Sequence, residues 1–122
     1  MDRLKIRADF LAAAAGIRRR MQGLTLEACT TPEASTKAGR ARVGFTASRK
    51  VGGAVERNRA KRRLRAAAAA LLPLYGREGN DYVLVARQDT LTRPFSGLLE
   101  DLATALDTVH AKLGKPVAGK KT

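Results

Sequence analysis

Residues with specialised chemistry are scarce in this sequence of 122 residues. It contains one cysteine, one histidine, three phenylalanines, two tyrosines and no tryptophan. The single cysteine, Cys29, excludes an intramolecular disulfide framework and any zinc site that needs several cysteines. Cys29 lies in a strand-like run and is interpreted as a plain half-buried thiol, and the expected compartment is the cytoplasm.

Long apolar segments and acidic residues are also scarce. No apolar run approaches the roughly 20 residues that span a bilayer, and the N-terminus has no signal-peptide pattern. Only 11 aspartates and glutamates stand against 24 lysines and arginines, which gives a net charge of +13. So large a charge repels itself in a compact chain unless a polyanion neutralises it, so we expect a nucleic-acid partner and no membrane partner.

Hydrophobic periodicity predicts one small α+β domain with a single sheet. We expect helices at residues 9–15, 54–72 and 94–109, strands at 24–29, 42–48 and 81–87, and a possible short strand at 17–20. The strand at 24–29 alternates apolar and polar residues, as a half-buried strand does. Asp9 is predicted to cap the first helix, and Pro73 with Gly76 to end the second. Residues 1–113 are assigned to the domain, and the tail 114–122 is expected to be disordered.

The positive charge is concentrated in one stretch that includes the second helix. Residues 40–65 contain ten basic residues and one acid, Glu56, which is +9 of the total +13. At about 100° per residue, one side of this helix carries the apolar residues Ala60, Leu64, Ala67 and Leu71. The other side carries Asn58, Lys61, Arg62 and Arg65, with Arg57, Arg59 and Arg63 at its borders. Solvated helix faces usually alternate acids with bases to form i,i+4 pairs, so this face indicates an anionic partner.

The composition of the basic helix favours RNA as that partner. Arginine presents a planar fork for phosphates and can stack on bases. Asn58 can donate and accept at a base edge or a 2′-hydroxyl, or alternatively act as an N-cap. The sequence has no helix-turn-helix, zinc-finger or basic-zipper pattern for duplex DNA. It also has too few aromatic residues for a broad base-stacking platform.

Residues 42–65, RVGFTASRKVGGAVERNRAKRRLR, resemble the signature of the bacterial ribonuclease P protein family. The matching parts are an R-[VI]-G strand, an S-[RK]-K turn, a glycine leading into A-V, and an R-N-R-x-[KR]-R helix. Weaker matches at residues 3–10, in the strand DYVLVAR and in the last helix extend the resemblance over residues 3–109.

The resemblance implies a two-layer α/β sandwich, ribosomal protein S5 domain 2-like, with a mixed sheet and three helices. In this fold the arginine-rich helix joins two parallel strands by a left-handed crossover. The resemblance also implies a monomeric protein that binds the catalytic RNA of ribonuclease P and the 5′ leader of precursor tRNA. The RNA hydrolyses the phosphodiester with Mg²⁺, and the protein itself holds no cofactor or metal.

Site residues follow from the resemblance by position. The residues expected to contact the catalytic RNA are Ser48, Arg49, Lys50, Arg57, Asn58, Arg59, Lys61, Arg62 and Arg65. Phe10 and Phe45 are candidate walls of a leader cleft on the sheet face beside the first helix, and for Phe45 a place in the core is equally favoured. Family members often carry further aromatic residues here, whereas this chain has Ala14 and no aromatic residue at 24–29.

No constellation for protein-based hydrolysis is visible. The only histidine, His110, lies near the end of the last helix, where a surface or helix-dipole role is expected. The acids are scattered, and the adjacent pair Glu100 and Asp101 points in different directions on a helix. A non-catalytic subunit of an RNA enzyme is therefore the favoured function, and a general or ribosomal RNA-binding protein is the alternative.

Overall fold

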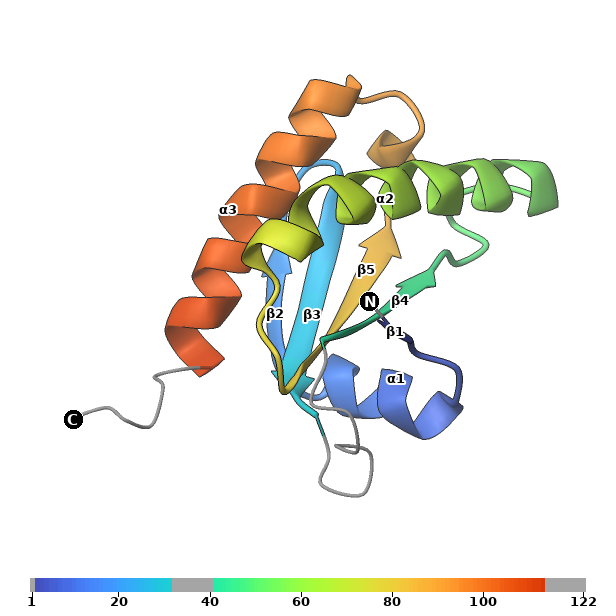
Figure 1. Ribbon diagram of the computed structural model, residues 1–122. Helices are drawn as coiled ribbons and strands as arrows, with labels where there is room; N and C mark the ends of the chain where they lie inside the picture. Colours follow the sequence, from blue (N-terminus) through green and yellow to red (C-terminus); the bar gives the residue numbers. More distant parts are fainter. Residues whose placement is uncertain (1, 32–40, 114–122) are drawn as a thin grey trace.

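The computed structural model describes residues 2–31 and 41–113, which form one five-stranded mixed sheet and three helices (Figure 1). The strands are β1 (Asp2–Arg3), β2 (Ile17–Arg20), β3 (Leu24–Thr30), β4 (Arg42–Thr46) and β5 (Asn80–Ala86). The helices are α1 (Arg7–Ala14), α2 (Ala54–Tyr75) and α3 (Phe95–Leu113), and a 3₁₀ turn at Gln88–Thr90 precedes α3. The predicted α+β fold is confirmed, including the short strand at 17–20. Strand β1 was not predicted, because a strand of two residues shows no periodicity in the sequence. The predicted disordered tail, residues 114–122, lies outside the described residues.

The strands follow the order β1-β4-β5-β3-β2 across the sheet. Strands β1, β4 and β5 are parallel, whereas β3 and β2 pair antiparallel with their neighbours. Adjacent parallel strands need a crossover connection over one face of the sheet, and α2 makes that connection between β4 and β5. This confirms the helix-linked pair of parallel strands that the family resemblance implies.

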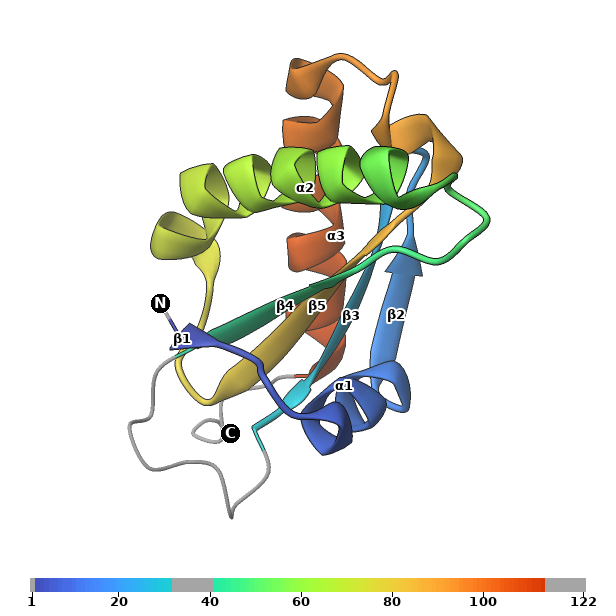
Figure 2. The same ribbon diagram turned by 90° about the vertical axis from the view of Figure 1, so that its right-hand side faces the viewer.

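Helices α2 and α3 pack on the same face of the sheet (Figures 1 and 2). The core beneath them contains Leu26 and Leu84 from the strands, Leu64 from α2 and Leu102 from α3, all fully buried. Ala60 of α2 is equally buried and brings the helix close to the sheet. Truncating one such leucine to alanine typically costs about 2–5 kcal/mol. The apolar stripe therefore fixes the rotation of α2 and turns its cationic side to solvent.

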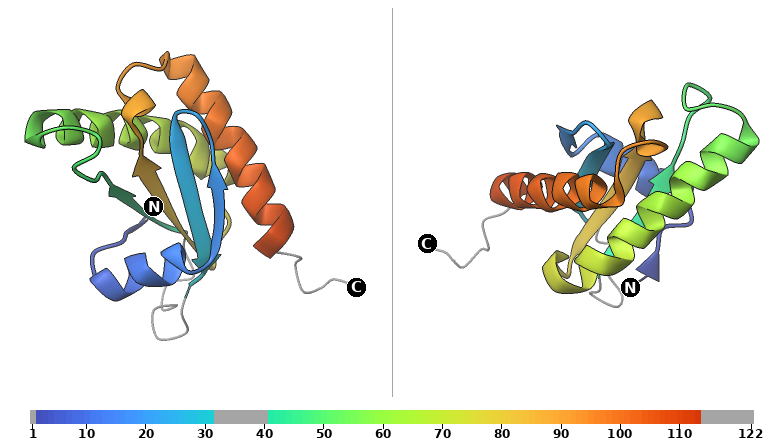
Figure 3. Two further views of the ribbon diagram at one scale, coloured as in Figure 1. Left: turned by 180° about the vertical axis from the view of Figure 1, so that it is seen from behind. Right: turned by 90° about the horizontal axis from the view of Figure 1, so that it is seen from above.

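Helix α1 lies on the opposite face and covers it only at one end (Figure 3, left). A second, smaller cluster there contains Leu4, Ala13 and Val83, with Phe10 packed against it. Gly44 of β4 lies beneath Phe10, and a Cβ on Gly44 would be 2.5 Å from Phe10 Cε1. Any larger residue at position 44 would push α1 away from the sheet. We call the side of the sheet that bears α1 the open face.

The predicted start of the first helix is wrong. Helix α1 begins at Arg7 with Ile6 as its N-cap, so Asp9 lies in the first turn. Asp9 is buried and pairs with Arg42 Nη1 at 3.2 Å, while Arg42 Nη2 pairs with the fully buried Asp81 at 2.7 Å. A buried carboxylate needs a charged partner, and here that partner comes from a strand distant in sequence. The Asp9–Arg42–Asp81 network ties α1 to the sheet.

Pro73 does not end the second helix, which continues beyond the predicted residue 72, whereas Gly76 ends it as predicted. Helix α2 passes through Pro73 and ends at Tyr75. Pro73 lacks the N–H that would bond the carbonyl of Ala69, but Ala69 is exposed, so water can satisfy that carbonyl. The N–H of Gly76 donates to the Leu72 carbonyl at 2.7 Å and closes the helix.

Strand β3 is more buried than predicted. Its residues on the open face include Thr25 and Glu27, which are only 6% and 7% exposed. The reason is its central position: α3 packs over one of its faces and α1 over the other. An alternating sequence pattern shows which face of a strand is polar and which is apolar, but it does not predict which helices cover each face.

Candidate nucleic-acid interface

The basic helix α2 begins with a cap supplied by its own single acid. Gly53 is the N-cap, and its N–H donates to Glu56 Oε1 at 2.9 Å. The carboxylate of Glu56 also lies in the first helical turn, where the helix dipole favours negative charge. Gly52 has φ of +146°, and a Cβ there would be 2.7 Å from Glu56 Cβ, so this turn requires glycine. The only acid among residues 40–65 thus has a role in folding.

The outer side of α2 carries positive charge without partners. Arg59, Arg62 and Arg65 are exposed, and Lys61 is half-buried. Across residues 2–31 and 41–113, none of these four side chains forms an ion pair or a hydrogen bond. Asn58 is exposed beside these cations and lies within the helix and not at its start, so the alternative prediction that Asn58 is the N-cap is wrong. Like charges three or four residues apart repel by a few tenths of a kcal/mol per pair, which a bound polyanion would reverse.

Two arginines at the borders of this side have contacts within the fold. Arg57 Nη1 donates to the Gly52 carbonyl at 3.1 Å, so Arg57 is held at the start of the helix beside the exposed cations. Arg63 turns the other way, with Nη1 donating to the Thr90 carbonyl and Nη2 to the Arg93 carbonyl at 2.7 Å. Arg63 therefore joins α2 to the turn before α3. The sequence pattern placed Arg63 at a border but could not reveal these carbonyl partners.

The turn before α2 extends the cationic surface. Ser48 Oγ accepts the Lys50 N–H at 3.3 Å, and the Ser48 carbonyl accepts the Val51 N–H at 3.0 Å. Gln88 Nε2 donates to the Lys50 carbonyl at 3.0 Å and fixes the turn from the end of β5. Arg49 and Lys50 are exposed. The structure thus brings the predicted residues 48–50 and the start of α2 into one surface.

The two candidate walls of the leader cleft do not lie together. Phe45 belongs to the main core beneath α2 and is 8% exposed, with the Arg3 guanidinium 5.1 Å from the centre of its ring. Phe10 packs over Gly44 on the open face, on the other side of the sheet. The prediction that both rings line one cleft is therefore wrong. Phe45 is a core residue, and Phe10 remains a predicted leader contact.

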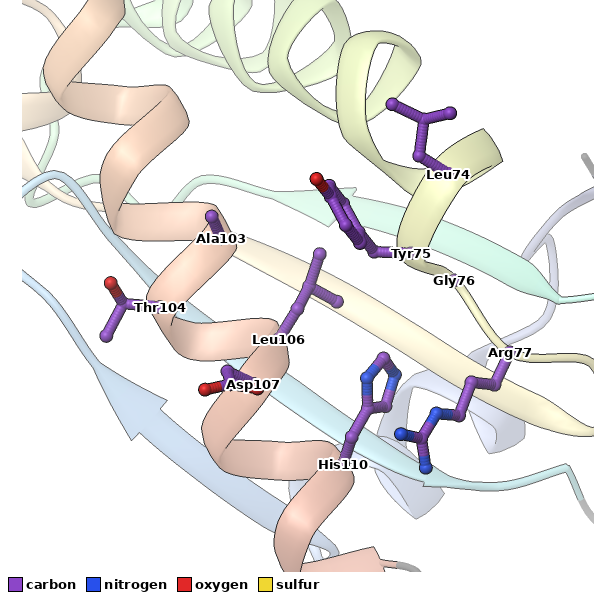
Figure 4. A pocket seen from close by; sticks show the side chains of 9 residues that line it. All are labelled: Leu74, Tyr75, Gly76, Arg77, Ala103, Thr104, Leu106, Asp107 and His110. Carbon is purple, nitrogen blue, oxygen red and sulfur yellow. The ribbon is translucent and has the colours of Figure 1, made fainter.

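The single histidine is buried and has a structural partner, so its predicted surface role is wrong, and it lies in the last turn of α3 as the helix-dipole alternative requires. His110 is 7% exposed, and its Nε2 lies 2.6 Å from the Tyr82 hydroxyl. Because the Tyr82 oxygen accepts the Arg77 N–H at 2.9 Å, its own proton is available for His110. His110 lines a pocket between the end of α2 and α3 together with Arg77 and Tyr75 (Figure 4). Burial, together with the Arg77 charge, lowers the pKa of His110.

Other reactive groups are sparse in the described part of the chain. Cys29 is half-buried as predicted, and burial with the nearby Asp81 charge raises the pKa of its thiol to about 11. Within residues 2–31 and 41–113, no three His, Cys, Asp or Glu side chains gather closely enough to hold a metal ion. In the same residues, none of the helices has the length and apolar character of a membrane span.

Fold and surface together define a small α+β protein whose longest helix exposes a cationic side, an arrangement typical of RNA-binding proteins. The family Ribonuclease P matches residues 1–110 of the chain. The ribonuclease P protein component of Paramagnetospirillum magneticum is 50% identical over 113 residues, covering 91% of this chain and 84% of its own length. That of Ruegeria pomeroyi is 53% identical over 109 residues, covering 88% and 86%. The chain therefore belongs to the ribonuclease P protein family.

Solved structures agree with this assignment at the level of the fold. The RNase P protein of Staphylococcus aureus superposes with a TM-score of 0.70 at 23% identity, covering 94% of this chain and 99% of that one. The RNase P protein from Thermotoga maritima gives a TM-score of 0.71 at 23% identity, covering 89% and 98%.

Proposed function

We propose that this chain is the protein subunit of ribonuclease P and acts in removal of the 5′ leader from precursor tRNA in the cytoplasm. Membership of the family and the names of its relatives support the subunit role. The single observation that carries the RNA-binding part is the outer side of α2, where exposed cations stand without partners in the described chain. A folded RNA supplies the negative charge that this side lacks.

The surface residues make different kinds of contact with the RNA, according to their side-chain chemistry. Arg59, Arg62 and Arg65 bind phosphates of the catalytic RNA through bidentate guanidinium contacts. Asn58, exposed between them, makes a polar contact with a base edge or a 2′-hydroxyl. Arg49, Lys50 and their neighbour Ser48 continue this contact at the turn before α2. The protein acts as a monomer on one RNA.

Hydrolysis belongs to the RNA in this proposal. His110 is committed to Tyr82 inside the fold, and the acids Asp9, Asp81 and Asp101 are engaged by arginines. A hydrolytic site needs a base or metal-binding carboxylates that are free to reach the substrate. The Mg²⁺ of the reaction is accordingly held by RNA phosphates, and the protein strengthens binding of RNA and leader.

Cleavage of a precursor tRNA at low Mg²⁺ tests this function. The cognate catalytic RNA is assayed with and without the protein, and the protein is assayed alone. Leader removal that requires both components supports the subunit role, and cleavage by the protein alone would contradict RNA catalysis. Tight RNA binding without any stimulation would instead favour the alternative of a general or ribosomal RNA-binding protein.

A further inference from the structure

A small apolar slot lies at the edge of the sheet beneath the second half of α2. Its volume is about 150 Å³, and its lining combines apolar side chains with two arginines, among them Arg3, Val43, Phe45, Arg65, Ala69 and Pro73. Val43 and Phe45 belong to the core on the face of the sheet that α2 covers, whereas α1 lies on the other face. The slot is therefore separate from the leader cleft that the family resemblance implies.

Two guanidinium groups stand at this slot, and none of the described residues that line it is acidic. Arg65 is exposed on the cationic side of α2 and has no ion pair or hydrogen bond in the described chain. Arg3 is also exposed, and its guanidinium lies 5.1 Å from the centre of the Phe45 ring, a cation–π contact that holds it at the slot. The slot thus continues the cationic side of α2 with an apolar floor between two cations.

Pro73 leaves a hydrogen-bond acceptor open beside the slot. In a regular helix the carbonyl of residue 69 accepts the N–H of residue 73, and Pro73 has no N–H to donate. Ala69 and Pro73 both line the slot, so the carbonyl between them lies at its wall. Because Ala69 is exposed, a donor from outside the protein can reach this acceptor.

We propose that the slot binds one unpaired base of the catalytic RNA, and this proposal rests on the proposed function. A cavity of about 150 Å³ holds one benzene-sized ring, whereas pockets for whole small-molecule ligands measure about 300–1,000 Å³. A base in RNA has a flat apolar ring, an edge with N–H donors, and a phosphate close by. These parts match the apolar floor, the Ala69 carbonyl and the two guanidinium groups. An apolar side chain of a protein partner would leave the carbonyl and both cations without partners.

The test measures binding of the protein to the cognate catalytic RNA across a range of salt concentrations. Precursor tRNA is left out, so that no leader contributes. Ala69→Leu fills the slot with a larger side chain and should weaken binding at least about fivefold, the loss of one stacked base. The salt slope should be unchanged, because the base itself carries no phosphate charge. In the same complexes, chemical probing should find a base that the wild-type protein protects and that Ala69→Leu leaves reactive.

Pro73→Ala separates this role from a loss of folding. Alanine restores the N–H for the Ala69 carbonyl and favours the helix. The variant should therefore be at least as stable as the wild type in urea unfolding, and it should bind the RNA about threefold to tenfold more weakly. Wild-type affinity in both Ala69→Leu and Pro73→Ala would overturn the slot.

Ala70→Leu is the matched control, since Ala70 is an exposed alanine of the same helix that does not line the slot. It should bind the catalytic RNA like the wild type. Equal losses for Ala69→Leu and Ala70→Leu would overturn the proposal, as would a smaller salt slope in Ala69→Leu, which would indicate displaced phosphates. Failure of the wild-type protein to bind the catalytic RNA would instead overturn the proposed function, so the two failures are distinguishable.

Discussion

Replacing Arg42 by alanine is expected to destabilise the protein more than any surface substitution. Arg42 is the shared partner of Asp9 and Asp81, which are 4% and 0% exposed. Its hydrogen bonds to Asp81 and Asp9 raise the pKa of the guanidinium and so favour its charged form in the fold. Removing one partner of a buried ion pair typically costs about 3–5 kcal/mol. Because domains are stable by only about 5–15 kcal/mol, Arg42→Ala should lose a large part of the total.

Urea unfolding at pH 7 measures this loss. A loss of about 3–5 kcal/mol corresponds to a melting temperature lower by about 10 °C or more in a domain of this size.

Arg62→Ala is the control for Arg42→Ala, since Arg62 is exposed on α2 and has no partner in the described residues. Its free energy of unfolding should lie within about 0.5 kcal/mol of the wild type. A loss below about 1 kcal/mol for Arg42→Ala would refute the role given to the buried network.

Two further substitutions test contacts that position the open face and α3. Gly44→Ala places a methyl group against Phe10 and should lower the free energy of unfolding, measured in urea, by about 1–3 kcal/mol. An unchanged free energy of unfolding would mean that α1 does not pack on β4. His110 has a lowered pKa in the fold, so the protein should lose stability as the pH falls from about 6.5 towards that lower value. His110→Gln should flatten this dependence in melts between pH 5 and 7.5, and an equal slope in both proteins would contradict the buried contact with Tyr82.

Periodicity in the sequence was sufficient to predict most of the elements and the cationic side of α2. The helical spacing of Ala60, Leu64 and Ala67 determined which side faces the sheet, and these three residues are buried. Alternation likewise predicted the strand at β4, and the continuous apolar run of Tyr82 to Val85 predicted β5, which helices α2 and α1 cover on its two faces.

Contacts between distant segments could not be predicted in this way. The partner of Asp9 lies on β4, and the partner of His110 lies on β5. Alternation placed Phe45 on a face of its strand but gave no information on which helix covers that face. The family resemblance grouped Phe10 with Phe45 as walls of one cleft, and the sheet separates the two rings.

Binding of the protein to the catalytic RNA across a range of salt concentrations tests the role of α2 most directly. The variant Arg59→Ala/Arg62→Ala removes two exposed cations from the helix, and Lys112→Ala removes one exposed cation from the last turn of α3. The double variant should bind at least about tenfold more weakly, with a salt slope smaller by about 0.7–0.9 per lost phosphate contact, while Lys112→Ala should match the wild type. An unchanged slope in the double variant would show that the cationic side of α2 does not bind the RNA.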